Sequence, residues 1–151
     1  MNEEQRSLLL KTSSRFPPPQ GVKLSYGTAG FRADASILES TVYRVGILAA
    51  LRSLKTKSVI GLMITASHNK VSDNGVKIAD PSGGMLTQNW EPFADALANA
   101  SDPEDLVRVA FHLSLYLGVL RVLFVPFLFL FCFEILLMSW RGRNCRDFRC
   151  L

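Results

Sequence analysis

Cysteine is missing from residues 1–131 of this 151-residue chain. The three cysteines, Cys132, Cys145 and Cys150, have neither a C-x-x-C spacing nor a histidine beside them, which argues against a zinc site. A secretory signal is also missing, because the only apolar run near the N-terminus is Leu8–Leu10. The sequence therefore favours a cytoplasmic protein whose main body has no thiol chemistry.

The first 108 residues lack a charge imbalance, since twelve lysines and arginines face eleven acidic residues. The net charge of +4 comes mostly from residues 109–151, where five arginines face Glu134 and Asp147. Nucleic acid is therefore not an expected partner. A hydrophobic content of 48% instead indicates a globular chain with one domain.

Composition divides the chain into three parts. Residues 1–19 form an N-terminal arm, in which a helical pattern over Glu3–Lys11 must end before the prolines at 17–19. Residues 20–108 form the predicted domain, and residues 109–151 form a hydrophobic and then arginine-rich tail.

Within the domain, the hydrophobic pattern predicts a strand over 22–25, a helix over 40–54 with Ser40 as N-cap, a strand over 59–64, a turn at 73–75, a hairpin over 76–86 and a helix around 90–97. Ser101 and Glu104 have the spacing of a capping box for a last helix. The apolar run Val59–Ile64 is typical of a parallel strand covered by helices on both faces. The predicted fold class is α/β, a three-layer α/β/α domain with a mixed sheet, followed by the hydrophobic C-terminal segment.

Polar residues that suit phosphoryl transfer follow the strand predicted at 59–64. Ser67 and His68 lie at its carboxyl end, where open α/β sheets bind their ligands. Phosphoryl transfer through a side chain needs a hydroxyl, nearby cations and an acid or base. Ser67 and His68 supply the first and last. Arg32, Lys70 and Lys77 are candidate cations. Taken singly, each has an ordinary interpretation, such as an ion pair of Arg32 with Asp34 or a solvent-facing Lys77.

Three motifs occur together and in order: Gly27–Arg32, Thr65–Asn69 and Asn74–Lys77. Jointly they resemble the signature of the α-D-phosphohexomutase superfamily, over about residues 20–108. The sequence Thr-Ala-Gly-Phe-Arg in the first motif is most similar to the corresponding motif of the branch that acts on N-acetylglucosamine phosphates, particularly its plant form. Lys70 stands where the family usually has proline.

The resemblance implies that Ser67 is the phosphorylated residue, that His68 and Arg32 are catalytic, and that Asn69 and Lys77 bind substrate phosphate. The implied reaction interconverts the 6-phosphate and 1-phosphate of N-acetylglucosamine for UDP-N-acetylglucosamine synthesis, with a hexosamine phosphate as partner. Glucose or mannose phosphomutase activity is the alternative within the superfamily. A non-catalytic, membrane-tethered fragment is the alternative outside it.

The resemblance also implies Mg²⁺, which in this family bridges the serine phosphate and three aspartates of an Asp-x-Asp-x-Asp loop. Ser67 would therefore meet the metal only through its phosphate, and this sequence has no such aspartate loop. The family places that loop, its sugar loop and its phosphate loop on three further domains. The chain alone is therefore expected to be inactive in the complete reaction.

The tail has 24 apolar residues among the 30 of Val109–Met138. One interpretation is a membrane association through residues 109–140, with a span over Val122–Trp140 whose following arginines stay in the cytosol. Another is a translated intron, because codons for Phe, Leu, Val, Ile and Met share uracil at the second base and the resemblance ends near Arg108. A folded extension of the core is the third.

Overall fold

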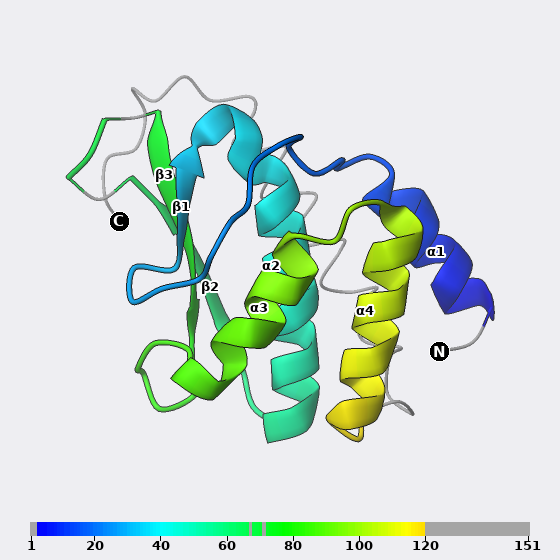
Figure 1. Ribbon diagram of the computed structural model, residues 1–151. Helices are drawn as coiled ribbons and strands as arrows, with labels where there is room; N and C mark the ends of the chain where they lie inside the picture. The colour runs from blue at the N-terminus through cyan, green and yellow to red at the C-terminus, as the bar shows by residue number, and fades with distance from the viewer. Residues whose placement is uncertain (1–2, 67, 71, 120–151) are drawn as a thin grey trace.

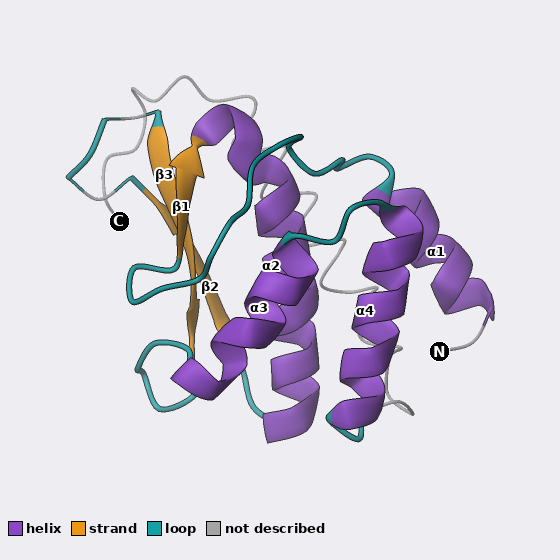
Figure 2. Cartoon of the chain, viewed as in Figure 1, coloured by secondary structure: helices purple, strands orange, loops and turns teal. Residues whose placement is uncertain are grey.

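The computed structural model describes residues 3–66, 68–70 and 72–119 (Figure 1). Its elements are α1 (Glu3–Ser13), β1 (Phe31–Asp34), α2 (Ala35–Thr56), β2 (Gly61–Thr65), β3 (Asp73–Ala79), the 3₁₀ helix η1 (Gln88–Trp90), α3 (Glu91–Ala98) and α4 (Pro103–Tyr116). Figures 1 and 2 show the sheet along one side of the molecule and the α-helices together on the other. The predicted α/β class is confirmed.

The sheet has the strand order β1-β3-β2, and every pairing among these described strands is antiparallel. Val76 lies opposite Phe31 on one side and Ile64 on the other. The predicted mixed sheet is therefore not found in the described residues, and the turn predicted at 73–75 is the first half of β3. These residues pair with β1, and a propensity for turns does not prevent such pairing when cross-strand neighbours are available.

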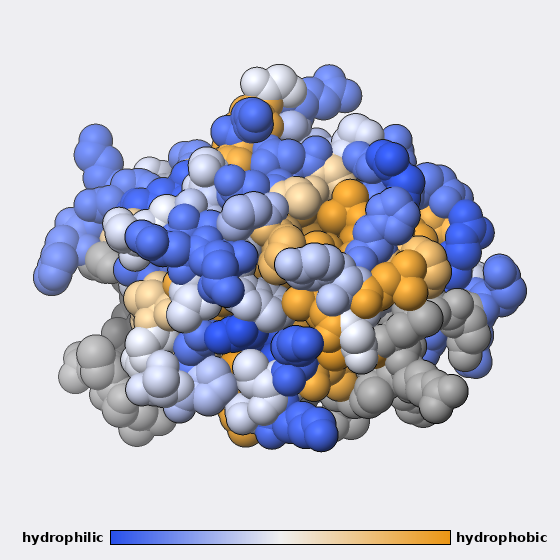
Figure 3. All heavy atoms as spheres, turned by 60° about the horizontal axis from the view of Figure 1, so that its bottom comes forward, coloured by the Kyte–Doolittle hydropathy of each residue, from blue (hydrophilic) through white to orange (hydrophobic). Residues whose placement is uncertain are grey.

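Strand β2 differs most from its prediction, because it lies at an edge of the described sheet. Met63 and Ile64 are 47% and 38% exposed, whereas burial on both faces was expected. An apolar run shows that a strand can be buried, but the neighbouring elements decide whether it is. The space-filling view likewise shows apolar side chains accessible on the surface among polar ones (Figure 3).

The core lies between the sheet and α2. Phe31, Val76 and Ile78 are fully buried on the face of the sheet that meets α2, together with Leu48. Helices α3 and α4 pack on α2, and α1 packs on α4. The helical spacing predicted for Trp90–Leu97 is confirmed, since these residues lie in η1 and α3.

Helix α2 begins earlier than predicted, because its N-cap is Asp34 and not Ser40. The Asp34 carboxylate accepts a hydrogen bond from the amide of Ser36 at 2.9 Å. An aspartate caps a helix at least as well as a serine. Ser40 is instead buried inside the helix. Placing Asp34 at this junction joins β1 directly to α2, so that the two elements have no loop between them.

The strand predicted at 22–25 is not formed, and these residues lie in a loop whose backbone pairs with side chains. Asn99 accepts from the Leu24 amide at 2.8 Å and donates to the Leu24 carbonyl at 2.7 Å. Asp95 accepts from the Tyr26 amide at 2.6 Å. Helix α3 and the residue after it thus satisfy the backbone groups that a neighbouring strand would otherwise pair.

Helix α4 has a capping arrangement one residue later than predicted. Asp102 is the N-cap and accepts from the Asp105 amide at 2.8 Å, while Asp105 accepts from the Ser101 amide at 2.9 Å. The predicted pair, Ser101 and Glu104, does not form the box. The carboxylates of Asp102 and Asp105 take its place, and both interact favourably with the positive end of the helix dipole.

The described fold continues beyond residue 108. Helix α4 extends to Tyr116, and Leu113, Leu117 and Val119 are buried in the core. The membrane span predicted over 122–140 falls outside the described residues. Among residues 3–66, 68–70 and 72–119, no helix combines the length and hydrophobicity needed to cross a bilayer.

Candidate functional site

Two predicted cations lie on the face of the sheet that points away from α2. Successive side chains of a strand point to opposite faces, and Val76 and Ile78 occupy the core face. Lys77 therefore lies on the outer face. Arg32 does so as well, because it pairs with Gly75 across the strands. Both cations are thus on one open surface, although they are 45 residues apart in the sequence.

Two glycines lie beside these cations. A Cβ atom on Gly30, whose φ is +74°, would lie 2.3 Å from the Val76 carbonyl oxygen and 2.8 Å from Cγ of Lys77. A Cβ atom on Gly75 would lie 3.5 Å from Cγ of Arg32. A side chain on Gly30 would collide with the Val76 carbonyl and press on Lys77, whereas at Gly75 the contact with Arg32 is of ordinary length, so Gly30 is the glycine that both the turn and the outer face require.

Asp73 joins two of the predicted site residues. Its Oδ2 atom accepts a hydrogen bond from Nδ2 of Asn69 at 2.5 Å and lies 3.1 Å from Nη2 of Arg32. The alternative pairing of Arg32 with Asp34 is not formed, because Asp34 binds the amide and hydroxyl of Ser36. These hydrogen bonds from Ser36 hold the pKa of Asp34 below its usual value.

The loop after β2 closes through its backbone. The Asn69 amide donates to the Ala66 carbonyl at 3.0 Å, and the Asp73 amide donates to the Lys70 carbonyl at 2.8 Å. Ser67, the predicted phosphorylated residue, falls outside the described residues. His68 is exposed and has no hydrogen bond or ion pair with another described residue.

The structure therefore brings Arg32 and Asn69 together, with Lys77 on the same outer face. Among the described residues, Lys77 has no ion pair or hydrogen bond through its side chain, so its charge is available to a ligand. Asp73 was not predicted as a site residue. Asp73 could have been found from its position two residues before Gly75. Gly75 is the cross-strand partner of Arg32, so Asp73 and Arg32 are diagonal neighbours on the sheet.

Tyr26 anchors the turn that precedes Arg32. Its buried hydroxyl accepts a hydrogen bond from the Ile78 amide at 2.9 Å, and its ring meets Phe31 edge to face at 5.1 Å. Burial raises the pKa of Tyr26. The turn itself closes when the Gly30 amide donates to the Gly27 carbonyl at 2.8 Å. Sequence reasoning missed this anchor because Tyr26 and Ile78 are far apart in the chain.

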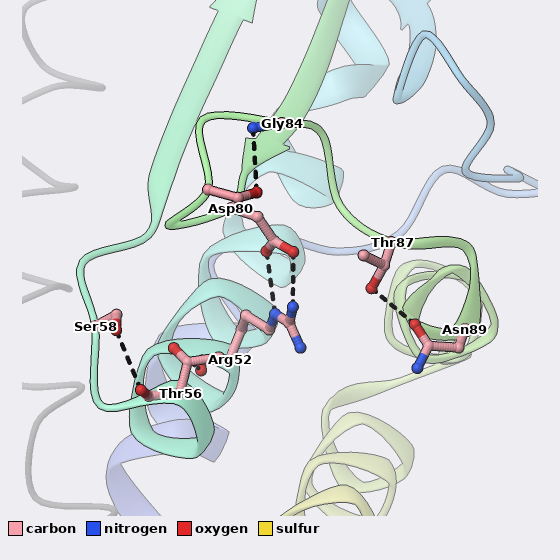
Figure 4. Close-up of polar contacts among 8 residues, drawn as sticks. Arg52, Thr56, Ser58, Asp80, Gly84, Thr87 and Asn89 are labelled. Carbon is pink, nitrogen blue, oxygen red and sulfur yellow. Dashed lines mark hydrogen bonds and ion pairs between the residues drawn. The ribbon is translucent and has the colours of Figure 1, made fainter.

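The described residues do not form a metal site of their own. No group of three potential metal-ligating side chains is found in residues 3–66, 68–70 and 72–119. Asp73 already binds Asn69 and Arg32, and Asp80 points away to Arg52 on α2 (Figure 4). The donor set present therefore does not fit a magnesium ion without further carboxylates.

A family model matches residues 46–103 of the chain: phosphoglucomutase/phosphomannomutase, alpha/beta/alpha domain I. The phosphoacetylglucosamine mutase of Arabidopsis thaliana is 73% identical over 110 residues, which are 72% of this chain and 20% of that protein. The chain therefore matches both a domain model and part of the sequence of a longer enzyme.

Two solved structures of Aspergillus fumigatus N-acetylphosphoglucosamine mutase have the same fold. A variant in complex with glucose 1,6-bisphosphate has a TM-score of 0.74 at 42% identity, covering 79% of this chain and 22% of that one. The enzyme in complex with GlcNAc-6P and magnesium has a TM-score of 0.67 at 43% identity, covering 76% and 21%.

The chain spans about a fifth of the length of these relatives. The likeness at more than 70% identity to the plant enzyme agrees with the motifs and with the matched domain model. Over the 110 aligned residues the chain is homologous to the phosphoacetylglucosamine mutases of the α-D-phosphohexomutase superfamily.

Proposed function

We propose that the chain carries the phosphoserine-bearing part of a phosphoacetylglucosamine mutase. In this function Ser67 exchanges a phosphoryl group with N-acetylglucosamine 6-phosphate and 1-phosphate. The observation that carries the proposal is the outer face of the sheet, where Arg32 and Lys77 lie together near the end of β2. Two cations on one open surface, next to a loop with a serine, suit a phosphoserine and a phosphorylated sugar.

Each predicted residue has a chemical role in this proposal. Phosphorylated Ser67 transfers its phosphoryl group to a free sugar hydroxyl, so that the Oγ–P bond breaks while a sugar O–P bond forms. His68 accepts the proton that leaves this hydroxyl. Arg32 and Lys77 neutralise charge on the moving group, and Asn69 donates a hydrogen bond to it. The bisphosphate then returns its other phosphoryl group to Ser67, with the proton moving in the opposite direction.

The proposal also covers the metal ion, the complete domain and the sugar phosphate that the relatives suggest. A magnesium ion would act at the serine phosphate only if carboxylates from outside the described residues completed its site, because Asp73 alone does not. A second helical layer would complete the three-layer fold, since the matched family is described as alpha/beta/alpha. The Aspergillus fumigatus relative in complex with GlcNAc-6P supports a hexosamine phosphate as the partner. A cytoplasmic location agrees with this metabolic role.

The proposal is tested by phosphorylation of the purified 151-residue chain with glucose 1,6-bisphosphate, followed by mass spectrometry of its peptides. We expect one phosphoryl group on the peptide that contains Ser67, and none in the Ser67→Ala variant. Ser72→Ala is the matched control, because Ser72 lies in the same loop and should not affect the label. Absence of label on wild-type protein, or label on the Ser67→Ala peptide, contradicts the assignment.

Sugar preference requires a second experiment on the same half-reaction. The phosphorylated chain is incubated with N-acetylglucosamine 6-phosphate or with glucose 6-phosphate, and loss of label from Ser67 is followed. Faster loss to the amino sugar supports the phosphoacetylglucosamine mutase function. Equal loss to both sugars would mean that the residues that determine sugar specificity lie outside this chain. The proposal for this chain would then be restricted to phosphoryl exchange.

A further inference from the structure

Asp73 forms an ion pair with Arg32, the cation that a bound phosphoryl group would need. Its Oδ2 atom is 3.1 Å from Nη2 of Arg32, and the same oxygen accepts the hydrogen bond from Nδ2 of Asn69. Nη2 of Arg32 also donates to the Asp73 carbonyl at 3.4 Å. Two residues proposed to bind phosphate thus already share one acceptor oxygen of the chain.

A phosphoryl group would compete with this carboxylate for the same donors. A phosphate ester has a charge of about −1.5 to −2 and three acceptor oxygens, whereas a carboxylate has a single charge and two oxygens. The guanidinium of Arg32 binds either group through its fork of N–H donors. On charge and number of acceptors, the phosphoryl group is the stronger partner for Arg32.

The ion pair is also accessible enough to be exchanged. The side chains of Arg32 and Asp73 are 28% and 45% exposed, and ion pairs in contact with solvent contribute little to stability. Lys77 lies two residues beyond Gly75 on the same face, so an anion bound to Arg32 would approach a second cation. The carboxylate of Asp73 itself would repel the anion, because both are negatively charged.

We propose that Asp73 is a displaceable anchor: its carboxylate holds Arg32 and Asn69 in place while the site is free of phosphate, and releases Arg32 when a phosphoryl group binds at the outer face of the sheet. Asp73 is thus a positioning residue and does not touch the reacting atoms. The proposal rests on the proposed function only for the identity of the phosphoryl group, since the ion pair and hydrogen bond are properties of the described fold.

The test is a titration of the full 151-residue chain with inorganic phosphate at constant ionic strength, followed by NMR chemical shifts. We expect Asp73→Asn to bind phosphate about 3- to 10-fold more tightly than wild type, because a single charged competitor for Arg32 has been removed. Glu104→Gln is the matched control, since it removes the carboxylate of the exposed Arg6–Glu104 ion pair between α1 and α4 and changes the net charge equally. Its phosphate affinity should stay within about 2-fold of wild type.

A double-mutant cycle shows whether the gain acts through Arg32. In an Arg32→Gln background, Asp73→Asn should no longer increase phosphate affinity. Asp73→Ser serves as a second variant, because it also removes the carboxylate but keeps a small polar side chain in β3. Thermal melts establish that each variant is folded, and either folded variant suffices for the cycle.

Two results would overturn the inference. One is a folded Asp73 variant with unchanged or weaker phosphate binding, and the other is a gain that persists without Arg32. Both can be told apart from failure of the proposed function, which depends on labelling of Ser67 by glucose 1,6-bisphosphate. Labelled Ser67 with no Asp73 effect refutes only the anchor, while an Asp73 effect without labelling refutes only the phosphoserine.

Discussion

Arg52 and Asp80 form a two-point ion pair between α2 and the residue after β3. Nε of Arg52 lies 3.0 Å from Oδ1 of Asp80, and Nη2 lies 2.6 Å from Oδ2 (Figure 4). The guanidinium also lies over the ring of Trp90, 4.5 Å from its centroid. One side chain on α2 therefore contacts both the end of the sheet and η1, the 3₁₀ helix that leads into α3.

Replacement of Asp80 by asparagine should destabilise the fold strongly. The side chains of Asp80 and Arg52 are only 5% and 15% exposed, so the substitution leaves a nearly buried cation without its counter-ion. Loss of one partner of a buried pair costs about 3–5 kcal/mol. Urea unfolding followed by circular dichroism measures this loss. Glu104→Gln, in an exposed ion pair with Arg6, is the control and should cost about 0–1 kcal/mol. Equal losses in the two variants would refute the prediction.

Two glycines of the first motif should respond differently to alanine. Gly30→Ala places a Cβ atom 2.3 Å from the Val76 carbonyl oxygen at a positive φ, so we expect a loss of more than about 2 kcal/mol. Gly27→Ala meets no atom within 4 Å and should change the free energy of unfolding by less than about 1 kcal/mol. Chemical denaturation of both variants compares them directly. A tolerated alanine at position 30 would show that the turn has another conformation.

Arg44 should stabilise the junction between the N-terminal arm and α2. The side chain is buried, and it donates to the carbonyls of Phe16 at 3.1 Å and Ala100 at 3.4 Å. Burial lowers the pKa of Arg44. Arg44→Met fills a similar volume but leaves these carbonyls without a donor, which we expect to cost about 1–3 kcal/mol. Thermal and urea unfolding measure the loss, and unchanged stability would mean that water replaces the guanidinium without cost.

Asp105 should contribute stability that disappears in acid. Hydrogen bonds from the Ser101 amide and from Arg108 hold the pKa of Asp105 below its usual value of 3.8. Because the folded pKa lies below the unfolded pKa, the ionised carboxylate stabilises the fold above the unfolded pKa. This contribution is lost as the pH falls through the folded pKa.

The corresponding experiment compares Asp105→Asn with wild type across the acid range. The variant should be less stable at about pH 7, and the difference should shrink as the pH falls through the folded pKa, where the wild-type carboxylate becomes protonated. Denaturant midpoints at several pH values give the two curves. Glu91→Gln, in the first turn of α3, is a control for the general effect of one fewer carboxylate near a helix start. Parallel curves for wild type and Asp105→Asn would contradict the prediction.

Local sequence determined several features of this protein. The periodic apolar residues from Trp90 to Leu97 predicted the helix that includes α3, because a single buried face requires that spacing. The turn residues around Asp80–Gly84 predicted a hairpin, in which Leu86 donates to the Ile78 carbonyl at 3.1 Å. The linked motifs also pointed to the homologous enzymes, since they specify residues and their order.

The tertiary structure alone decided which partners those residues find. Whether β2 is covered, whether Asp34 or Asp73 pairs with Arg32, and whether Leu24 meets a strand or Asn99 all depend on elements far away in the chain. An ion pair or a strand edge has several acceptable partners, and local propensity ranks them only weakly. Residue types and their periodicity therefore determined the elements and the candidate chemistry of this protein, whereas packing selected the contacts, because only the folded chain brings the competing groups within bonding distance.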